Sequence, residues 1–187
     1  HFREHIAWAE SSAVCFANSI VGAYTNREGG PSALAAALTG RTAEYELHLE
    51  ENRMAQVKYE VKAKLKNTDD FGLLGHVIGN RTGKSIPYIT GISRASTEEL
   101  KSFCASVATY GGVAIFHMEG ITPNRTTIPD KTEIITEKDL RSARTQLDDE
   151  GAEIDFISVG CPHASIKEIG QIADMLDGKS VTKGKTV

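Results

Sequence analysis

The chain has 187 residues, of which 40% are hydrophobic and 25% charged. This is the composition of a globular protein with enough apolar side chains for a core, and one domain is the default expectation. The net charge is -4 and the Lys and Arg residues are scattered, so we expect no nucleic-acid partner. No apolar run approaches the length of a bilayer-spanning helix, so we also expect no membrane partner.

The three cysteines, Cys15, Cys104 and Cys161, are far apart in the sequence and include no C-x-x-C pair. This argues against a disulfide scaffold or a self-contained zinc site and favours a reducing, cytoplasmic compartment. Cys15 and Cys104 lie in apolar helical patterns, so core packing is their expected role. The chain begins at His1 within an apolar pattern, and we interpret it as an internal piece of a longer protein.

The first forty residues predict two helices joined by a glycine-rich turn. Apolar residues recur at helical spacing over residues 6–21, and Gly22 follows where a helix can end. Pro31 then suits the first position of a second helix, which Gly40 would end.

The remaining sequence predicts alternating strands and helices. Residues 55–65 alternate between apolar and charged side chains, which predicts a strand with one wet face at the edge of a sheet. Further strands are expected at residues 86–92, 113–118 and 154–159. Helices are expected at residues 71–78, from Ser96 to about residue 109, after Thr136, and from Ser165 to residue 176, with a long loop at 122–131. This order predicts an α/β fold with a mostly parallel sheet and flanking helices, and residues 179–187 are expected to be a linker or a frayed end.

Residues 160–165, with the sequence GCPHAS, form the first candidate site because they fall between an expected strand and the start of a helix. This is the usual ligand edge of an open α/β sheet. A helix N-terminus lowers the pKa of a nearby thiol, so Cys161 could be a nucleophile or a metal thiolate, with His163 assisting either role. The alternative is a small buried cysteine followed by an N-capping serine, Ser165, in a tight turn.

Residues 25–32, with the sequence TNREGGPS, form the second candidate site. Their glycine pair would let the backbone approach an anion, and Arg27 could hold a carboxylate or phosphate while Thr25 and Asn26 add neutral hydrogen bonds. The alternative is an ordinary turn that carries a surface arginine. Polar groups also interrupt the expected first helix and require either a hydrogen-bond network or a substrate-lined cavity; they are Glu10, Ser11 and Ser12.

Three ordered segments give these sites a family resemblance. Residues 7–14 (AWAESSAV), 25–34 (TNREGGPSAL) and 160–165 together resemble the large, catalytic subunit of the aconitase X family. The resemblance runs along essentially the whole chain, whereas family members are considerably longer. It implies that residues 1–187 are part of an aconitase-like catalytic region.

The resemblance implies a hydro-lyase that uses a 4Fe–4S cluster, in which one iron is open to the substrate hydroxyl as a Lewis acid. Cys161 matches one of its three cysteine ligands, and the other two are expected outside this chain. A small swivelling subunit or domain is the expected partner and the expected source of the catalytic serine base. The implied substrate-binding residues are Glu10, Ser11, Thr25, Asn26, Arg27, His163 and Ser165.

Two hydroxy-acid substrates fit this family. The overall sequence resembles the archaeal two-subunit form. This favours dehydration of mevalonate 5-phosphate, a step of isoprenoid synthesis by the mevalonate pathway, over dehydration of cis-3-hydroxy-L-proline. From the residues alone, a non-catalytic α/β module that binds an anion at residues 25–32 stays open.

Overall fold

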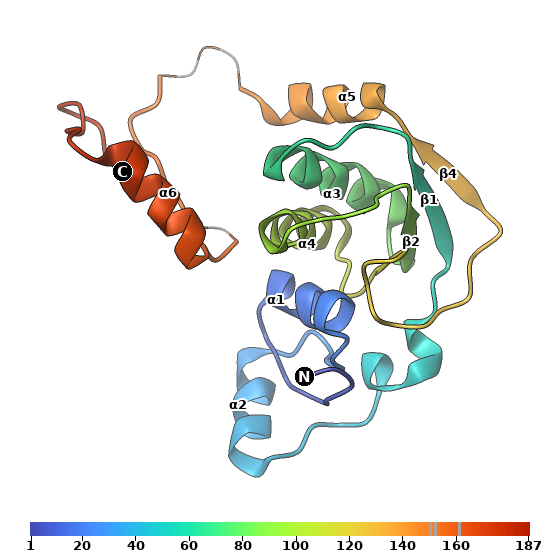
Figure 1. Cartoon of the computed structure of the whole chain (residues 1–187). Coiled ribbons are helices and arrows are strands. Elements are labelled where there is room, and N and C mark those ends of the chain that lie inside the picture. Colours follow the sequence, from blue (N-terminus) through green and yellow to red (C-terminus); the bar gives the residue numbers. More distant parts are fainter. Residues whose placement is uncertain (150, 152, 161) are drawn as a thin grey trace.

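The computed structural model describes residues 1–149, 151, 153–160 and 162–187. Its centre is a four-stranded sheet in the order β3-β2-β1-β4, in which every neighbouring pair is parallel. The expected α/β fold with a parallel sheet is therefore confirmed (Figure 1). The strands are β1 (Val57–Val61), β2 (Pro87–Thr90), β3 (His117–Met118) and β4 (Thr132–Ile135).

The prediction that the first strand lies at an edge is wrong. Lys58 pairs with Tyr88 of β2 on one side and with Thr132 of β4 on the other, so β1 is an interior strand. Its second neighbour, β4, was not expected from the sequence. The segment is short, and its burial pattern is mostly exposed or intermediate, so its apolar residues give a weak strand signal.

Two long helices and one shorter helix pack beside the sheet. They are α3 (Thr68–Thr82), α4 (Thr97–Gly111) and α5 (Glu137–Leu147). Asn67 caps α3, and Ser96 and Glu99 form the expected capping box of α4. Gly112 ends α4 in a left-handed conformation with φ of 65°, which a glycine adopts without strain.

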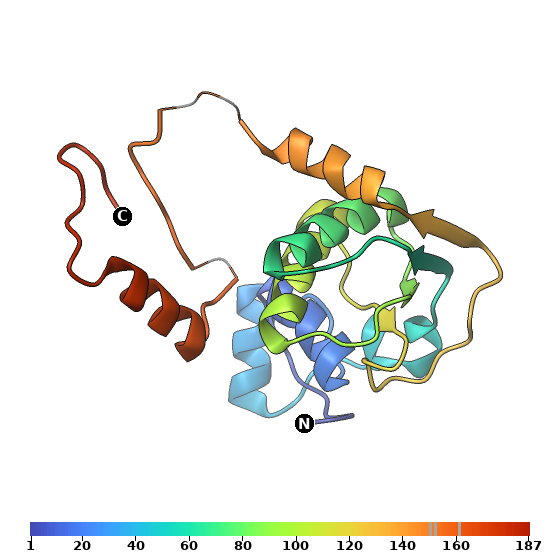
Figure 2. The ribbon, with the colours of Figure 1, turned by 45° about the horizontal axis from the view of Figure 1, so that its top comes forward.

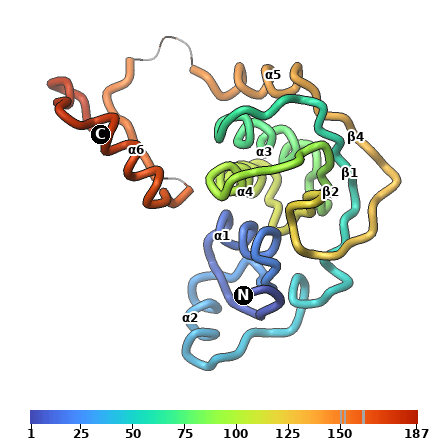
Figure 3. The backbone as a smooth tube through the Cα atoms, in the orientation of Figure 1, coloured from blue at the N-terminus to red at the C-terminus, as the bar shows by residue number. Residues whose placement is uncertain are grey.

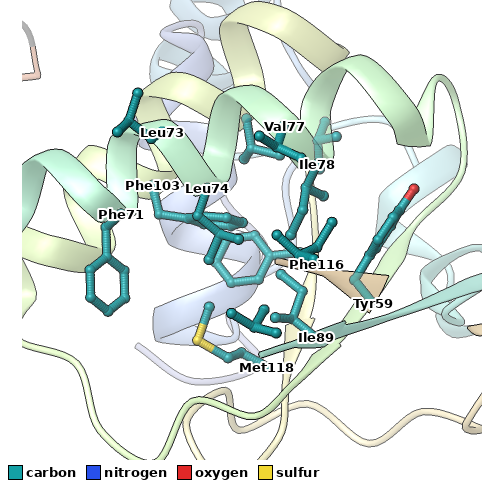
Figure 4. Packing of buried hydrophobic residues seen from close by; sticks show 14 of the residues in the cluster. Tyr59, Phe71, Leu73, Leu74, Val77, Ile78, Ile89, Phe103, Phe116 and Met118 are labelled. Atoms are coloured by element: carbon teal, nitrogen blue, oxygen red, sulfur yellow. The ribbon is translucent and has the colours of Figure 1, made fainter. Parts of the chain in front are cut away.

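Glycines let α3 and α4 approach closely. A Cβ placed on Gly75 would lie 2.8 Å from the carbonyl oxygen of Phe103, and one on Gly79 would lie 2.9 Å from the amide nitrogen of Gly111. Small residues at such positions allow two helix backbones to come together. Figure 4 shows the resulting core, in which residues of these helices meet residues of the sheet. Phe103 and Phe116 pack there edge to face, with ring centroids 4.8 Å apart.

The N-terminal region begins with an extended segment instead of the expected helix from residue 6. Two parallel bridges, His5 to Tyr24 and Trp8 to Arg27, hold this segment against the chain that follows the first helix. The elements of this region are α1 (Ser11–Phe16), a π-helical turn (Ala17–Val21), α2 (Gly30–Thr39) and two 3₁₀ turns (Glu46–His48 and Glu50–Arg53). The expected ends of the two helices at Gly22 and Gly40 are confirmed by their left-handed conformations.

Arg53 fastens this region from inside. Only 2% of the residue is exposed, and its guanidinium donates hydrogen bonds to the carbonyl oxygens of Leu47, Asn18 and Ala23 at 2.8, 3.2 and 2.9 Å. It also lies 4.0 Å from the centroid of the Tyr24 ring. Burial removes water from this charge and so lowers the pKa of Arg53. The hydrogen bonds and the cation–π contact offset part of this cost.

The C-terminal region differs from the sequence prediction in one respect. Residues 154–159, expected as a strand, form a single bridge from Phe156 to Thr186 and stay exposed. Their apolar residues pair with no strand of the sheet. The expected final helix is confirmed as α6 (Ile166–Leu176), which starts at the capping box of Ser165 and Glu168.

The path of this region is visible in two further views. Figure 2 shows α6 and the tail beside the sheet and helices, and Figure 3 shows the long connection from α5 that leads to them. Among the described helices, none has both the length and the apolar character that crossing a bilayer requires.

Candidate functional site

The start of α1 is organised by a carboxylate. Glu10 precedes the helix, and its side chain accepts hydrogen bonds from the amide nitrogens of Ser12 and Ala13 at 2.9 and 2.6 Å and from the Ser12 hydroxyl at 2.7 Å. The polar cluster at residues 10–12 therefore has partners without needing a cavity. Ser11 is the first residue of the helix and is partly exposed.

Three influences determine the charge state of Glu10. Partial burial acts to raise the pKa of its carboxyl, but hydrogen bonds from Ser12 and Ala13 lower it, and the nearby imidazole of His163 lowers it further. The net pKa is below the ordinary value, so the carboxylate is charged at neutral pH. Glu10 and His163, which are far apart in the sequence, therefore lie within electrostatic range of each other.

Ser165 joins the C-terminal candidate site to α4. Its hydroxyl donates to a carboxylate oxygen of Glu98 at 3.2 Å and accepts from the amide nitrogen of Glu168 at 3.2 Å. Lys101 forms an ion pair with Glu168 at 2.8 Å. The Lys101 ammonium, with the amide nitrogen of Ser165, lowers the pKa of Glu168 to about 2. The first turn of α6 is therefore docked on the first turn of α4.

Cys161, the expected metal ligand, lies outside the described residues. Pro162, which follows it, lines a cavity of about 470 Å³ between α3, α4 and the end of α5. Ser102 and Arg144 are among the polar residues of this cavity. Pro162 and Ser165 thus lie beside α4, and His163 lies within electrostatic range of Glu10 at the start of α1; we call this arrangement of chain segments distant in sequence the polar junction.

Thr25 and Asn26 lie in the segment that follows the first helix, and their buried side chains form hydrogen bonds with backbone atoms. The Thr25 hydroxyl accepts from the amide nitrogen of Trp8 at 3.1 Å and donates to the carbonyl oxygen of Asn26 at 2.8 Å. The Asn26 amide donates to the carbonyl oxygen of Tyr45 at 3.1 Å and accepts from the amide nitrogen of Leu47 at 2.8 Å. These contacts hold the segment that presents Arg27.

Arg27 is exposed, and its guanidinium donates to the carbonyl oxygens of Ala108 and Val113 at 3.3 and 3.5 Å. It therefore lies at the C-terminal end of α4, where a cation suits the helix dipole. Ser165 contacts Glu98 at the other end, about 15 Å away along the helix axis at 1.5 Å per residue. The structure places His163 within electrostatic range of Glu10 and docks Ser165 on α4, but it places Arg27 at a different end of that helix.

Cys15 and Cys104 pack in the core, which confirms their expected role. Both are free thiols, with exposures of 0% and 1%. Burial raises the pKa of the Cys104 thiol well above its ordinary value, and a hydrogen bond with Cys15 raises it further. A thiol that stays protonated is a poor metal ligand. In the described part of the chain, no three His, Cys, Asp or Glu side chains come together as a metal-binding group.

Sequence reasoning did not single out the two residues of α4 that receive the C-terminal site. Glu98 and Lys101 look like an ordinary solvated helix face in the sequence. The only local signal was the capping box at Ser96 and Glu99, which placed Glu98 in a first turn. Their partners lie 67 residues away, so sequence spacing could not reveal the contacts.

The fold defines an α/β protein with a parallel sheet, and the polar junction is its candidate site. Comparison with known protein families identifies the family. Residues 1–51 match the family model of the aconitase X first domain, and residues 55–147 match that of the aconitase X second domain. The chain belongs to the aconitase X family.

Relatives with known functions carry two different names. The large subunit of phosphomevalonate dehydratase from Thermococcus kodakarensis is 49% identical over 94% of this chain, and the cis-3-hydroxy-L-proline dehydratase from Hypocrea jecorina is 35% identical over 95%. The crystal structure of Thermococcus kodakaraensis aconitase X in its holo-form matches 94% of the chain with a TM-score of 0.85 and 46% identity. The chain covers 46% of that crystallised chain, 46% of the first relative and 32% of the second, so it spans about half the length of the archaeal large subunit.

Proposed function

We propose that this chain forms part of the large subunit of a hydro-lyase that dehydrates mevalonate 5-phosphate. The observation that carries the proposal is the difference in identity between two groups of relatives. The phosphomevalonate dehydratase large subunits from Thermococcus kodakarensis and Methanosarcina mazei are 49% and 42% identical to the chain, whereas the two cis-3-hydroxy-L-proline dehydratases are 35% and 36% identical. The hydroxyproline enzyme is the second candidate.

The family resemblance suggests an iron–sulfur cofactor for this enzyme. When bound, a 4Fe–4S cluster would supply an open iron that acts as a Lewis acid. The described residues do not by themselves fit such a group, because Cys15 and Cys104 are buried against each other and a metal-binding trio is absent from this part of the chain. We therefore assign one ligand, Cys161, to this chain and expect two further cysteine ligands outside it.

The remaining roles follow from the polar junction. Glu10, Ser11, His163 and Ser165 are proposed to contact the substrate or its immediate surroundings, because they gather where α1 and α6 begin. Arg27 is proposed to hold the substrate carboxylate, with Thr25 and Asn26 fixing its segment; this requires the guanidinium to give up two long hydrogen bonds to carbonyl oxygens. A serine of a small partner subunit is the proposed base. The two free buried thiols support a reducing, cytoplasmic location.

The proposal is tested with the complete large subunit assembled with its small subunit. Iron and acid-labile sulfide are measured after anaerobic reconstitution, and dehydration is assayed with mevalonate 5-phosphate and with cis-3-hydroxy-L-proline. We expect Cys161→Ser to lose iron and activity together, and Cys104→Ala, the matched control for a buried cysteine, to keep its iron. Equal iron in both variants would contradict the role of Cys161. Turnover of cis-3-hydroxy-L-proline alone would show that the enzyme is the hydroxyproline dehydratase, the second candidate.

A further inference from the structure

A cavity of about 550 Å³ lies at the carboxyl ends of two neighbouring strands. Val61 ends β1, Gly91 follows β2, and both line the cavity together with Phe71 from the first turns of α3. A Cβ on Gly91 would collide with the carbonyl oxygen of Val61, so only glycine lets the two strand ends meet without a side chain between them.

The sheet topology marks this edge as a ligand edge. The chain adds β2 and β3 on one side of β1 and then β4 on the other, so the reversal of winding lies between β1 and β4, and the cavity lies next to it at the ends of β1 and β2. In open α/β sheets, ligands bind outside the carboxyl ends of the strands next to such a reversal. In addition, α3 and α4, each 15 residues long, start beside the cavity and direct the positive ends of their dipoles towards it.

The side chains of this cavity are strongly cationic. Its lining includes four basic residues: Lys62, Lys64, Lys66 and Arg94. The three lysines alternate with the less exposed Ala63 and Leu65 along the segment after β1, so their side chains lie on one face.

Carboxylates also lie beside this segment, but they bond its backbone: Glu137 accepts from the amide nitrogen of Lys64 at 2.8 Å and Asp70 from that of Lys66 at 2.9 Å. The carboxylate that lines the cavity, Glu99, is held in the capping box by the amide nitrogen of Ser96 at 2.7 Å. Lys62 pairs with Glu60, whereas no ion pair involves Lys64, Lys66 or Arg94 within the described residues. These carboxylates are engaged with backbone amides, so a dianion in the cavity could pair directly with the side chains of Lys64, Lys66 and Arg94.

We propose that this cavity binds a phosphate monoester dianion. Lys64, Lys66 and Arg94 supply charge and hydrogen-bond donors, and the planar guanidinium can hold two phosphate oxygens at once. The cavity is next to the polar junction, because Glu99 lines it while the adjacent Glu98 receives Ser165. The phosphate therefore belongs either to the substrate, which rests on the proposed function, or to a separate phosphorylated metabolite.

The binding test uses the complete large subunit assembled with its small subunit and inorganic phosphate, titrated by calorimetry at low ionic strength. We expect saturable binding that weakens with added chloride. Arg94→Gln and Lys64→Gln should each weaken it by about tenfold, because each removes one charge-assisted contact. Arg125→Gln and Lys183→Gln, which remove exposed cations away from the cavity, serve as matched controls. Equal affinity in all four variants, or no saturable binding, overturns the proposal.

A second arm identifies the source of the phosphate with the complete two-subunit enzyme. If the substrate supplies it, inorganic phosphate competes with mevalonate 5-phosphate, and Arg94→Gln raises KM by about tenfold while kcat changes little. If phosphate binds but does not compete, a separate metabolite occupies the cavity. An enzyme that dehydrates neither substrate, while phosphate binding keeps its sensitivity to Arg94→Gln, would refute the proposed function and leave the phosphate site in place.

Discussion

The close contact between α3 and α4 can be tested by adding one methyl group. A Cβ on Gly75 would lie 2.7 Å from the Cβ of Ser106, 2.8 Å from the carbonyl oxygen of Phe103 and 3.0 Å from the amide nitrogen of Val107. Two of these atoms belong to the backbone, so Gly75→Ala forces the two helices apart, at a cost of about 1–3 kcal/mol for overpacking. Alanine also favours the helix by up to about 1 kcal/mol relative to glycine. We expect a net loss of about 1–2 kcal/mol.

Urea unfolding followed by circular dichroism measures this loss. With a slope of about 2 kcal/mol per molar urea, the midpoint should fall by about 0.5–1 M without a change in slope. Gly170→Ala is the matched control, because Gly170 lies within α6 with no atom within 4 Å of the added Cβ. That variant should be unchanged or up to about 1 kcal/mol more stable. If Gly75→Ala is as stable as the wild type, the close helix contact is refuted.

Three further predictions concern charged residues. Arg53→Met should lower the free energy of unfolding by about 3 kcal/mol in the same urea assay, because buried carbonyl oxygens lose their donor, and an effect below about 1 kcal/mol would contradict its fastening role. Glu10→Gln should cost about 1 kcal/mol at neutral pH. Folding lowers the pKa of Glu10, so the difference in unfolding free energy between the wild type and Glu10→Gln should be fully present above the unfolded-state pKa of about 4.3. It should vanish as pH falls through the folded-state pKa. A difference that does not depend on pH would count against a charged cap. Glu168→Gln should speed amide hydrogen exchange in α6 and not in α4. In the wild type, the protection factors of the α6 amides, which are corrected for the intrinsic pH dependence of exchange, should fall as pH falls from the unfolded-state value towards the Glu168 pKa of about 2. Unchanged protection would show that Lys101 does not hold α6 in place.

The features that sequence reasoning predicted correctly are mainly local ones. The capping boxes at Ser96 and Ser165 and the helix ends at Gly22 and Gly40 all appear as expected. In each case, the hydrogen bonds or the backbone conformation involve residues only a few positions apart. The alternation of helices and strands also predicted the parallel sheet, because strands joined through helices run in the same direction.

The incorrect predictions depended on distant neighbours. Residues 154–159 are rich in apolar and β-branched side chains, yet no described strand pairs with them beyond one bridge. β4 was overlooked, although its pairing with β1 makes β1 interior. The helix expected from residue 6 starts only at Ser11, because Trp8 is held in extended conformation by its bridge to Arg27. A strand or an extended segment is stabilised by a partner that the local pattern does not contain.

The sequence by itself determined the helix boundaries set by caps and glycines, the parallel α/β class, and three ordered segments specific enough to indicate the family. Only the tertiary structure decided which chemical groups meet. It placed His163 within electrostatic range of Glu10, docked Ser165 on Glu98, and lined one cavity with four cations. The physical reason is that capping and chain reversal depend on nearest neighbours along the chain, whereas the electrostatics of a site depend on distances in space between residues that folding alone brings together.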